Sequence, residues 1–309
     1  MAIVIIRQDG KIPEWKEALS AASPSIPIYS YLEEHPKEAI EMALVWKHPP
    51  GALRPYKNLK CISGSGAGVD FIFNDKEAPL HLPITRVVDQ VLAKDMSEHV
   101  IGVILAYLKN LYTYKVDQAN RVWRPLPYRR MGDYTIGILG MGALGVVLAK
   151  DLLHFGFPVQ GWSNSKKNIE TVKSFVGKNE LSDFLSTTQV LVCLLPLTEN
   201  TTGILNKALF QQLPKGAFVI NVARGGHLVD EDLLEMLDNG HLSGAGLDVY
   251  HQEPLPVSHP FWAHPKIHMT PHYASVSDTR SVVPQILENY KRLQAGEPLL
   301  NLVSKERGY

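Results

Sequence analysis

Three glycines, Gly140, Gly142 and Gly145, occur at the spacing G-x-G-x-x-G, which is typical of turns that bind the phosphates of a dinucleotide. The first glycine permits a tight turn, the second lets the backbone approach a pyrophosphate, and the third lets a helix pack close to a strand. An apolar run at 136–139 predicts a strand before the motif, and 146–155 predicts a helix after it, whose first N–H groups would face the phosphates. A glycine-rich turn in another α/β domain is the alternative.

The next predicted strand, 159–163, lacks the acidic residue that binds a ribose hydroxyl in NAD-specific domains. No Asp or Glu occurs from Leu152 to Ile169. Hydroxyl groups and lysines stand there instead, and they suit a 2′-phosphate, so the sequence predicts that NADPH is preferred over NADH. An ordinary solvated basic loop is the alternative. The residues concerned are Ser163, Asn164, Ser165, Lys166 and Lys167.

Polar side chains also follow three later strand signals. Arg224 follows one, Asp248 lies near the end of another with Glu253 just beyond it, and His272 follows a third. Because ligands bind outside the carboxyl ends of parallel strands, a cation, a carboxylate and an imidazole can converge on one site here. Each residue alone also fits a non-catalytic interpretation, such as a surface charge, a turn or a structural histidine.

A second glycine-rich segment, 64–70, follows the strand predicted at 59–63. Its successive small residues can point backbone N–H groups at an anion. A flexible turn is the alternative.

Apolar runs alternate with helical patterns along the chain, which predicts parallel α/β sheets. The six strand signals from 136 to 270 predict a six-stranded doubly wound domain. A long helical pattern at 97–122 separates the two α/β regions and ends at Trp123 and Pro125, so it predicts an interdomain connector. Further strands are predicted at 3–6, 26–31, 42–46, 59–63, 190–195, 216–222, 244–249 and 267–270, and further helices at 14–22, 228–237 and 278–295.

Composition limits the classes of partner. The 309 residues carry 31 basic and 31 acidic side chains, which gives no electrostatic case for nucleic acid or membrane. No apolar run approaches the roughly 20 residues that span a bilayer, and the first residues predict a strand better than a signal peptide. No Cys/His cluster has metal-ligand spacing, so no metal is expected. Cys61 and Cys193 lie in apolar runs and are expected to be buried thiols in a reducing cytoplasm.

Taken together, these motifs resemble the D-isomer-specific 2-hydroxyacid dehydrogenase family. The resemblance covers about 60–280 and includes the segments Asn221–Gly225, Leu247–Val249, Glu253–Pro254 and Pro271–Ala274 in the family order. The whole chain is most similar to the bacterial glyoxylate/hydroxypyruvate reductase A group.

The resemblance implies two doubly wound parallel-sheet α/β domains, Rossmann-like or flavodoxin-like, with an active-site cleft between them. The substrate domain would comprise 1–98 and 276–309, and the dinucleotide-binding domain 99–275. Arg224 would hold the substrate carboxylate and carbonyl oxygen, His272 would donate and accept the proton, and Glu253 would orient His272. The substrate carboxylate would bind the amides of Gly66, Ala67 and Gly68, with Trp46 beside them. The cofactor would contact Gly140, Met141, Gly142, Ala143, Leu144, Gly145, Ser163, Asn164, Ser165, Lys166, Leu195, Pro196, Val222, Ala223 and Asp248.

The expected activity is NADPH-dependent reduction of small 2-oxo acids by hydride transfer, from glyoxylate to glycolate and from hydroxypyruvate to D-glycerate, with NAD as a weaker cofactor. The expected assembly is a homodimer. Two alternatives are another member of the family, of the 3-phosphoglycerate or D-lactate type, and a dinucleotide-sensing binding protein like the family's corepressors. The missing acidic residue after 159–163 argues against an NAD-preferring enzyme, and the set of Arg224, Glu253 and His272 argues against a binding protein.

Overall fold

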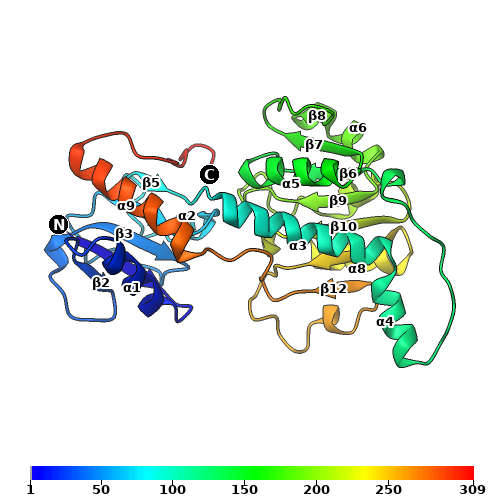
Figure 1. Ribbon diagram of the computed structural model, residues 1–309, viewed down its shortest axis with the longest axis horizontal. Helices are drawn as coiled ribbons and strands as arrows, with labels where there is room; N and C mark the ends of the chain where they lie inside the picture. The colour runs from blue at the N-terminus through cyan, green and yellow to red at the C-terminus, as the bar shows by residue number, and fades with distance from the viewer. Residues whose placement is uncertain (1) are drawn as a thin grey trace. The chain divides into compact units, whose positions relative to one another are not determined.

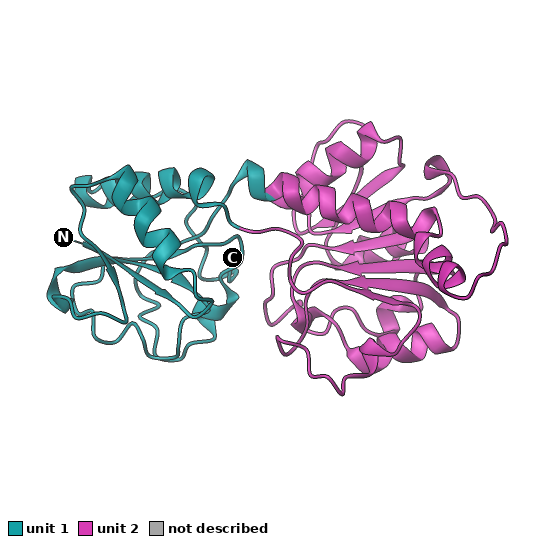
Figure 2. Ribbon diagram, turned by 60° about the horizontal axis from the view of Figure 1, so that its bottom comes forward, with its two compact units in different colours: residues 1–92, 277–309 teal, residues 93–276 magenta. Residues whose placement is uncertain are grey.

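A computed structural model describes residues 2–309 of the chain, which divides into two compact units. Unit 1 comprises 1–92 and 277–309, and unit 2 comprises 93–276 (Figure 2). The predicted boundaries, 98/99 and 275/276, lie close to these bounds. Each unit is built on its own parallel sheet, so the prediction of two parallel α/β domains is confirmed.

Unit 1 contains a five-stranded sheet in the order β2-β1-β3-β4-β5, in which all pairings between the named strands are parallel. All six residues of β1 are buried, because β1 lies inside the sheet and both of its faces are covered. The sequence pattern missed β5, which has only two residues. The strands are β1 Ala2–Arg7, β2 Ile28–Ser30, β3 Ile40–Trp46, β4 Cys61–Gly64 and β5 Ile84–Thr85.

The helices of unit 1 are α1 (Ile12–Ala22), α2 (Asp70–Phe73) and α9 (Thr279–Ala295), with a 3-10 turn η1 at Lys37–Ala39. Helix α9 comes from the end of the chain and packs beside α1, which forms near its beginning (Figure 1). Asp278 caps α9 by accepting the backbone N–H of Arg280.

Unit 2 contains a seven-stranded parallel sheet in the order β12-β11-β10-β9-β6-β7-β8. The chain starts in the middle at β6, runs outward through β7 and β8, and then returns to β9 on the other side of β6. The order therefore reverses between β6 and β9, which is where doubly wound sheets bind ligands. The strands are β6 Ile136–Leu139, β7 Val159–Ser163, β8 Lys173–Val176, β9 Val190–Cys193, β10 Ala217–Asn221, β11 Leu242–Leu247 and β12 Ile267–Met269.

Helices cover both faces of this sheet (Figure 1). Alternate residues of β9 enter different cores, because strand side chains point alternately to opposite faces: Val190 and Val192 pack in one apolar cluster, Leu191 and Cys193 in the other. The helices are α3 Gln90–Leu108, α4 Leu111–Ala119, α5 Ala143–His154, α6 Leu181–Ser186, α7 Lys207–Phe210 and α8 Asp230–Asp238, with 3-10 turns η2 Met131–Asp133, η3 Lys178–Glu180, η4 Gly225–His227 and η5 Pro260–Trp262.

Two predictions about unit 2 were wrong in detail. The sheet has a seventh strand, β8, which was missed because only Phe175 of its four residues is buried, so its apolar pattern is weak. The single helix predicted at 97–122 is two helices, since Asn110 adopts a left-handed conformation with φ of 56° and interrupts the helical hydrogen bonds.

Both cysteines are buried free thiols, as the sequence predicted. Burial raises the pKa of Cys61 and of Cys193 to about 12, so both are protonated at neutral pH.

Candidate active site

The glycine-rich turn joins β6 to α5. Gly140 has a φ of 109°, a backbone conformation that residues other than glycine rarely adopt. A Cβ on Gly145 would overlap the carbonyl oxygen of Gly140. By contrast, a Cβ added at exposed Gly142 meets no described atom within 4 Å. Gly142 is also the N-cap of α5 and supplies no side-chain cap. The turn therefore leaves room for a ligand beside a helix N-terminus, which favours phosphate groups.

The strand next to this turn is β7, and its carboxyl end carries the predicted 2′-phosphate loop. The backbone N–H of Gly140 donates to the carbonyl of Trp162 at 3.0 Å, so the end of β7 lies beside the glycine turn. Ser163 Oγ donates to the carbonyl of Ser165 at 2.7 Å, which curls the loop. Asn164, Ser165 and Lys166 are exposed. Their polar groups are therefore accessible to a ligand in unit 2.

The ends of β9 and β10 supply the apolar members of the predicted cofactor set. A Cβ on Gly140 would meet the carbonyl oxygen of Leu194 at 2.7 Å, so the segment that continues to Leu195 and Pro196 borders the glycine turn. Val222 and Ala223 follow β10 and are buried. The structure thus places these residues at the same carboxyl edge of the sheet as the glycines.

Asp248 organises the turn that carries His272. Its carboxylate is buried and accepts three hydrogen bonds, from Thr270 Oγ1 at 2.5 Å, from the N–H of Tyr273 at 2.8 Å and from the N–H of Ala274 at 3.0 Å. The backbone carbonyl of Asp248 also accepts the N–H of His272 at 2.8 Å. This residue was predicted to contact the cofactor, and that contact stays a prediction.

His272 and Glu253 form a close pair. His272 Nδ1 lies 2.7 Å from Glu253 Oε2, and both side chains are partly exposed. A carboxylate only accepts hydrogen bonds, so Nδ1 carries the proton in this contact and Nε2 is directed elsewhere. Glu253 Oε1 accepts the backbone N–H of Tyr250 at 3.1 Å, which fixes the carboxylate. His272 also has a φ of 53°, an uncommon backbone conformation for a residue with a side chain.

Arg224 lies in the turn after β10. Its Nη1 donates to the carbonyl of Ala223 at 2.7 Å, while its own carbonyl accepts the side chain of buried Asn221 at 2.9 Å. A Cβ on Gly225 would overlap the backbone of Tyr250. The missing side chain of Gly225 thus lets the Arg224 turn lie directly against the segment that leads to Glu253. Within unit 2 the three predicted catalytic residues therefore follow neighbouring strands of one sheet edge.

In unit 1 the structure brings Trp46 and Gly66 together. A Cβ on Gly66 would overlap the Trp46 ring, so only glycine fits there. Trp46 ends β3, and its ring makes an edge contact with Phe71 at 5.6 Å between centroids. Ala67 and Gly68 are half-buried. The predicted substrate residues of this unit therefore share the carboxyl ends of β3 and β4.

Sequence reasoning missed Arg86, which follows β5. The next residue, Val87, donates its N–H to the carbonyl of Gly66 at 2.9 Å. Burial lowers the pKa of the Arg86 guanidinium, and no Asp or Glu among residues 2–309 forms an ion pair with it. The only local signal was an arginine after Ile84–Thr85, a pair too short to predict a strand.

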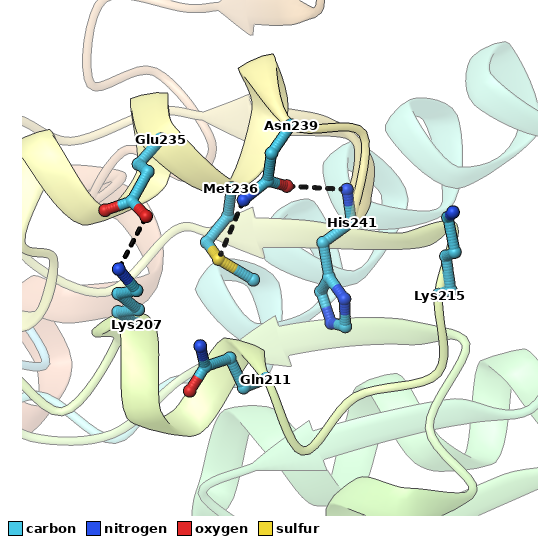
Figure 3. A pocket seen from close by; sticks show the side chains of 7 residues that line it. All are labelled: Lys207, Gln211, Lys215, Glu235, Met236, Asn239 and His241. Atoms are coloured by element: carbon cyan, nitrogen blue, oxygen red, sulfur yellow. Dashed lines mark hydrogen bonds and ion pairs between the residues drawn. The ribbon is translucent and has the colours of Figure 1, made fainter.

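One hollow on the surface of unit 2 lies at the opposite edge of the sheet (Figure 3). Lys215 and His241 in its lining come just before β10 and β11, whereas the candidate site residues follow these strands. Lys207 in the hollow is already paired with Glu235 at 2.5 Å. The full lining is Lys207, Gln211, Lys215, Glu235, Met236, Asn239 and His241.

Residues 2–309 contain neither a metal-ligand cluster nor a helix suited to a membrane. No group of three or more His, Cys, Asp or Glu side chains in this range is arranged to hold a metal ion. Over the same range, no helix has the length and apolar character that crossing a membrane requires.

Comparison with known proteins identifies the family. Residues 101–274 match the model of the D-isomer specific 2-hydroxyacid dehydrogenase NAD binding domain. Glyoxylate/hydroxypyruvate reductase A of Klebsiella pneumoniae strain 342 is 38% identical, and the match covers all of both chains.

Solved structures of similar proteins support the same family assignment. A D-isomer specific 2-hydroxyacid dehydrogenase of Xanthobacter autotrophicus Py2, in complex with NADPH and MES, is 37% identical with a TM-score of 0.94, over 100% of this chain and 99% of that one. The NADPH-dependent glyoxylate/hydroxypyruvate reductase of Sinorhizobium meliloti, in complex with NADP and sulfate, is 36% identical with a TM-score of 0.93, over the same shares. The chain belongs to the D-isomer specific 2-hydroxyacid dehydrogenase family.

Proposed function

We propose that this oxidoreductase reduces small 2-oxo acids, glyoxylate and hydroxypyruvate first, with NADPH as the preferred reductant. The observation that carries the proposal is the His272–Glu253 pair at 2.7 Å, on the same sheet edge as Arg224 and the open glycine turn of Gly142. Relatives of 36–38% identity are named as glyoxylate/hydroxypyruvate reductases, and one of them as NADPH-dependent.

The residues of unit 2 fit a dinucleotide. Open space at Gly142, the uncapped start of α5 and the exposed polar groups after β7 suit a pyrophosphate and a 2′-phosphate. When bound, the reduced nicotinamide supplies the hydride. We therefore assign cofactor binding to unit 2 and assign substrate binding by Trp46 and the Gly66–Gly68 amides to unit 1.

The proposed roles of the protein follow from charge. Reduction of a carbonyl leaves negative charge on its oxygen, which Arg224 stabilises with its guanidinium and His272 neutralises by donating a proton from Nε2. Glu253 holds Nδ1 of His272 and so orients the imidazole with Nε2 directed away from the carboxylate. The Arg224 fork also binds the substrate carboxylate in two hydrogen bonds.

Initial rates with glyoxylate, hydroxypyruvate and pyruvate, each with NADPH and with NADH, test the function directly. We expect the highest kcat/KM for glyoxylate or hydroxypyruvate with NADPH. Faster turnover of pyruvate with NADH would favour a D-lactate type enzyme. Tight NADPH binding without turnover of any 2-oxo acid would favour a dinucleotide-sensing protein.

The cofactor preference is tested at Ser163. We expect Ser163→Asp to shift the preference toward NADH, because a carboxylate repels the 2′-phosphate and accepts a hydrogen bond from a ribose hydroxyl. The native preference should be moderate, since Lys166 offers a mobile ammonium rather than a planar fork. The measurement is kcat/KM for both cofactors at fixed ionic strength, because salt screens the lysine. Ser163→Asn is the matched control, because asparagine has the size of aspartate without its negative charge. If Ser163→Asp leaves the ratio of kcat/KM for NADPH to kcat/KM for NADH unchanged, this loop does not select the cofactor.

A homodimer built through 99–132 is the proposed assembly. Beyond α4 the chain presents apolar side chains to solvent: Trp123 is 99% exposed and Tyr128 74% exposed. Exposed apolar surface of this kind marks protein–protein contacts. We expect light scattering to give the mass of a dimer at micromolar concentration, and Trp123→Glu to shift it toward a monomer. A native monomer at that concentration contradicts the proposal.

The cytoplasm is the proposed location. Cys61 and Cys193 are both buried free thiols, which is the usual state of cysteines in a reducing compartment.

A further inference from the structure

The segment that joins β11 to β12, residues 248–266, must hold Glu253 in place although much of it is exposed. His251, Gln252 and Pro254 around Glu253 are exposed, and Leu255 is the nearest neighbour that packs against the apolar core. Exposed loops with few apolar contacts open easily. Tyr250, Leu255 and Phe261 anchor the segment to the core. Polar contacts add to this packing and fix the carboxylate that meets His272 at 2.7 Å.

Asp230, the first residue of α8, contacts this segment at two points on either side of Glu253. Its Oδ2 lies 3.3 Å from Nε2 of His259, and its Oδ1 lies 3.5 Å from Nε2 of His251. His259 Nδ1 accepts the N–H of Phe261 at 3.3 Å, so Nε2 carries the proton and donates to Asp230. The Asp230 carboxylate thus accepts a hydrogen bond from His259 and lies close to His251, at the two ends of the stretch 251–259.

The same end of the segment is also fixed by backbone contacts. His251 Nε2 lies 2.9 Å from the carbonyl of Leu228, a distance suited to an N–H donating to that oxygen. A Cβ on Gly225 would overlap the backbone that links Tyr250 to His251. The N–H of Tyr250 in turn donates to Glu253 Oε1 at 3.1 Å. A continuous chain of contacts therefore runs from Asp230 through His251 and Tyr250 to Glu253.

The Asp230 carboxyl experiences opposing electrostatic effects. Burial raises the pKa of the Asp230 carboxyl, and the nearby charge of Glu231 acts in the same direction, whereas His251 and His259 favour the carboxylate. Asp230 is thus a half-buried acceptor whose described partners are the two histidines of the 248–266 segment.

We propose that Asp230, through His251 and His259, is a positioning residue that holds Glu253 against His272. The proposal rests on the proposed roles of Glu253 and His272 in proton transfer. No hydrogen bond or ion pair among residues 2–309 joins Asp230 to the glycine turn or to His272, so its loss should slow the chemical step without weakening NADPH binding.

The test is Asp230→Ala, compared with Asp232→Ala as a matched control. Both carboxylates lie in the first turn of α8, but Asp232 accepts the N–H of Lys207 at 2.8 Å and faces α7 instead. Since misplacing a catalytic group by about 1 Å can cost roughly 10²-fold, we expect Asp230→Ala to lower kcat by about tenfold or more. Asp232→Ala should leave kcat within about twofold, and NADPH fluorescence titration should give unchanged Kd values for both variants.

A double-mutant cycle with Glu253→Gln separates positioning from general destabilisation. If Asp230 acts through Glu253, Asp230→Ala should have almost no further effect on kcat in the Glu253→Gln background. An equal loss in both backgrounds, an unchanged kcat in Asp230→Ala, or a parallel rise in the Kd for NADPH would each overturn the proposal.

Two further variants separate the positioning role of Asp230 from misfolding and from a failure of the proposed role of Glu253. His259→Phe retains the ring beside Phe261, whose centroid lies 4.4 Å away, but removes the donor to Asp230 together with the acceptor of the Phe261 N–H. It should reproduce the kcat loss even if Asp230→Ala does not fold. An unchanged kcat in His259→Phe then overturns the proposal. Glu253→Gln alone tests the underlying function: if it leaves kcat unchanged, the proposed role of Glu253 fails, whereas a loss there with none in Asp230→Ala refutes only the positioning role.

Discussion

His272→Ala is expected to abolish most turnover while leaving the binding of NADPH nearly unchanged. The proposed proton donor would be lost, and removing a general acid typically costs roughly 10²–10⁴-fold in rate. This corresponds to about 3–5 kcal/mol of transition-state stabilisation. Most of the predicted cofactor residues lie on other turns, such as Gly140–Gly145 and the loop after β7. Asp248 accepts the backbone N–H of His272, which alanine keeps.

The measurements for His272→Ala are kcat with glyoxylate or hydroxypyruvate and the Kd for NADPH by fluorescence titration. His154→Ala, at the exposed end of α5, is a control for the loss of an imidazole elsewhere in unit 2. A near-normal kcat in His272→Ala would reject the assignment of His272 as the proton donor. A large rise in the Kd for NADPH would instead indicate that the turn 270–274 had been disturbed.

Arg224→Lys should lower kcat/KM strongly, by roughly 10²-fold, a loss of the size seen when one transition-state donor is removed. Lysine keeps the positive charge but replaces a planar fork with a mobile ammonium. The native fork is held in part by the hydrogen bond from Nη1 to the carbonyl of Ala223 at 2.7 Å. The lysine ammonium is a compact point charge, so it does not present two parallel N–H donors to a carboxylate in the fixed plane that the arginine fork provides.

The Arg224→Lys experiment separates geometry from charge. Arg280→Lys is the matched control, because Arg280 is exposed and pairs with Asp278 at the start of α9. We expect kcat/KM of that variant to be unchanged. If kcat/KM of Arg224→Lys also stays within about twofold, the fork does not clamp the substrate.

Several features were readable from local sequence. The glycine spacing predicted the turn between β6 and α5, because the backbone there requires glycine at positions only a few residues apart. Gly140 has a φ of 109°, and Gly145 closely approaches the carbonyl of Gly140. The positions of Arg224, Glu253 and His272 after strand signals were equally local. In a parallel sheet such residues must share one edge, so their grouping in unit 2 follows from strand order.

Other features depend on contacts between distant segments. The three hydrogen bonds that hold the turn around His272 come to Asp248 from residues more than twenty positions away, and no periodicity signals them. The strands β5 and β8 form because a neighbouring strand supplies their hydrogen bonds, not because of their own apolar pattern.

The sequence by itself therefore determined the class of fold, the family resemblance and which residue types stand at the ends of the strands. The tertiary structure decided how those residues are held: the pairing of Glu253 with His272, the role of Asp248 in fixing the turn and the contacts of Asp230 with both ends of the 251–259 stretch. The physical reason is that hydrogen-bond geometry between remote segments depends on their packing, whereas backbone conformation and strand patterning depend on a few adjacent residues.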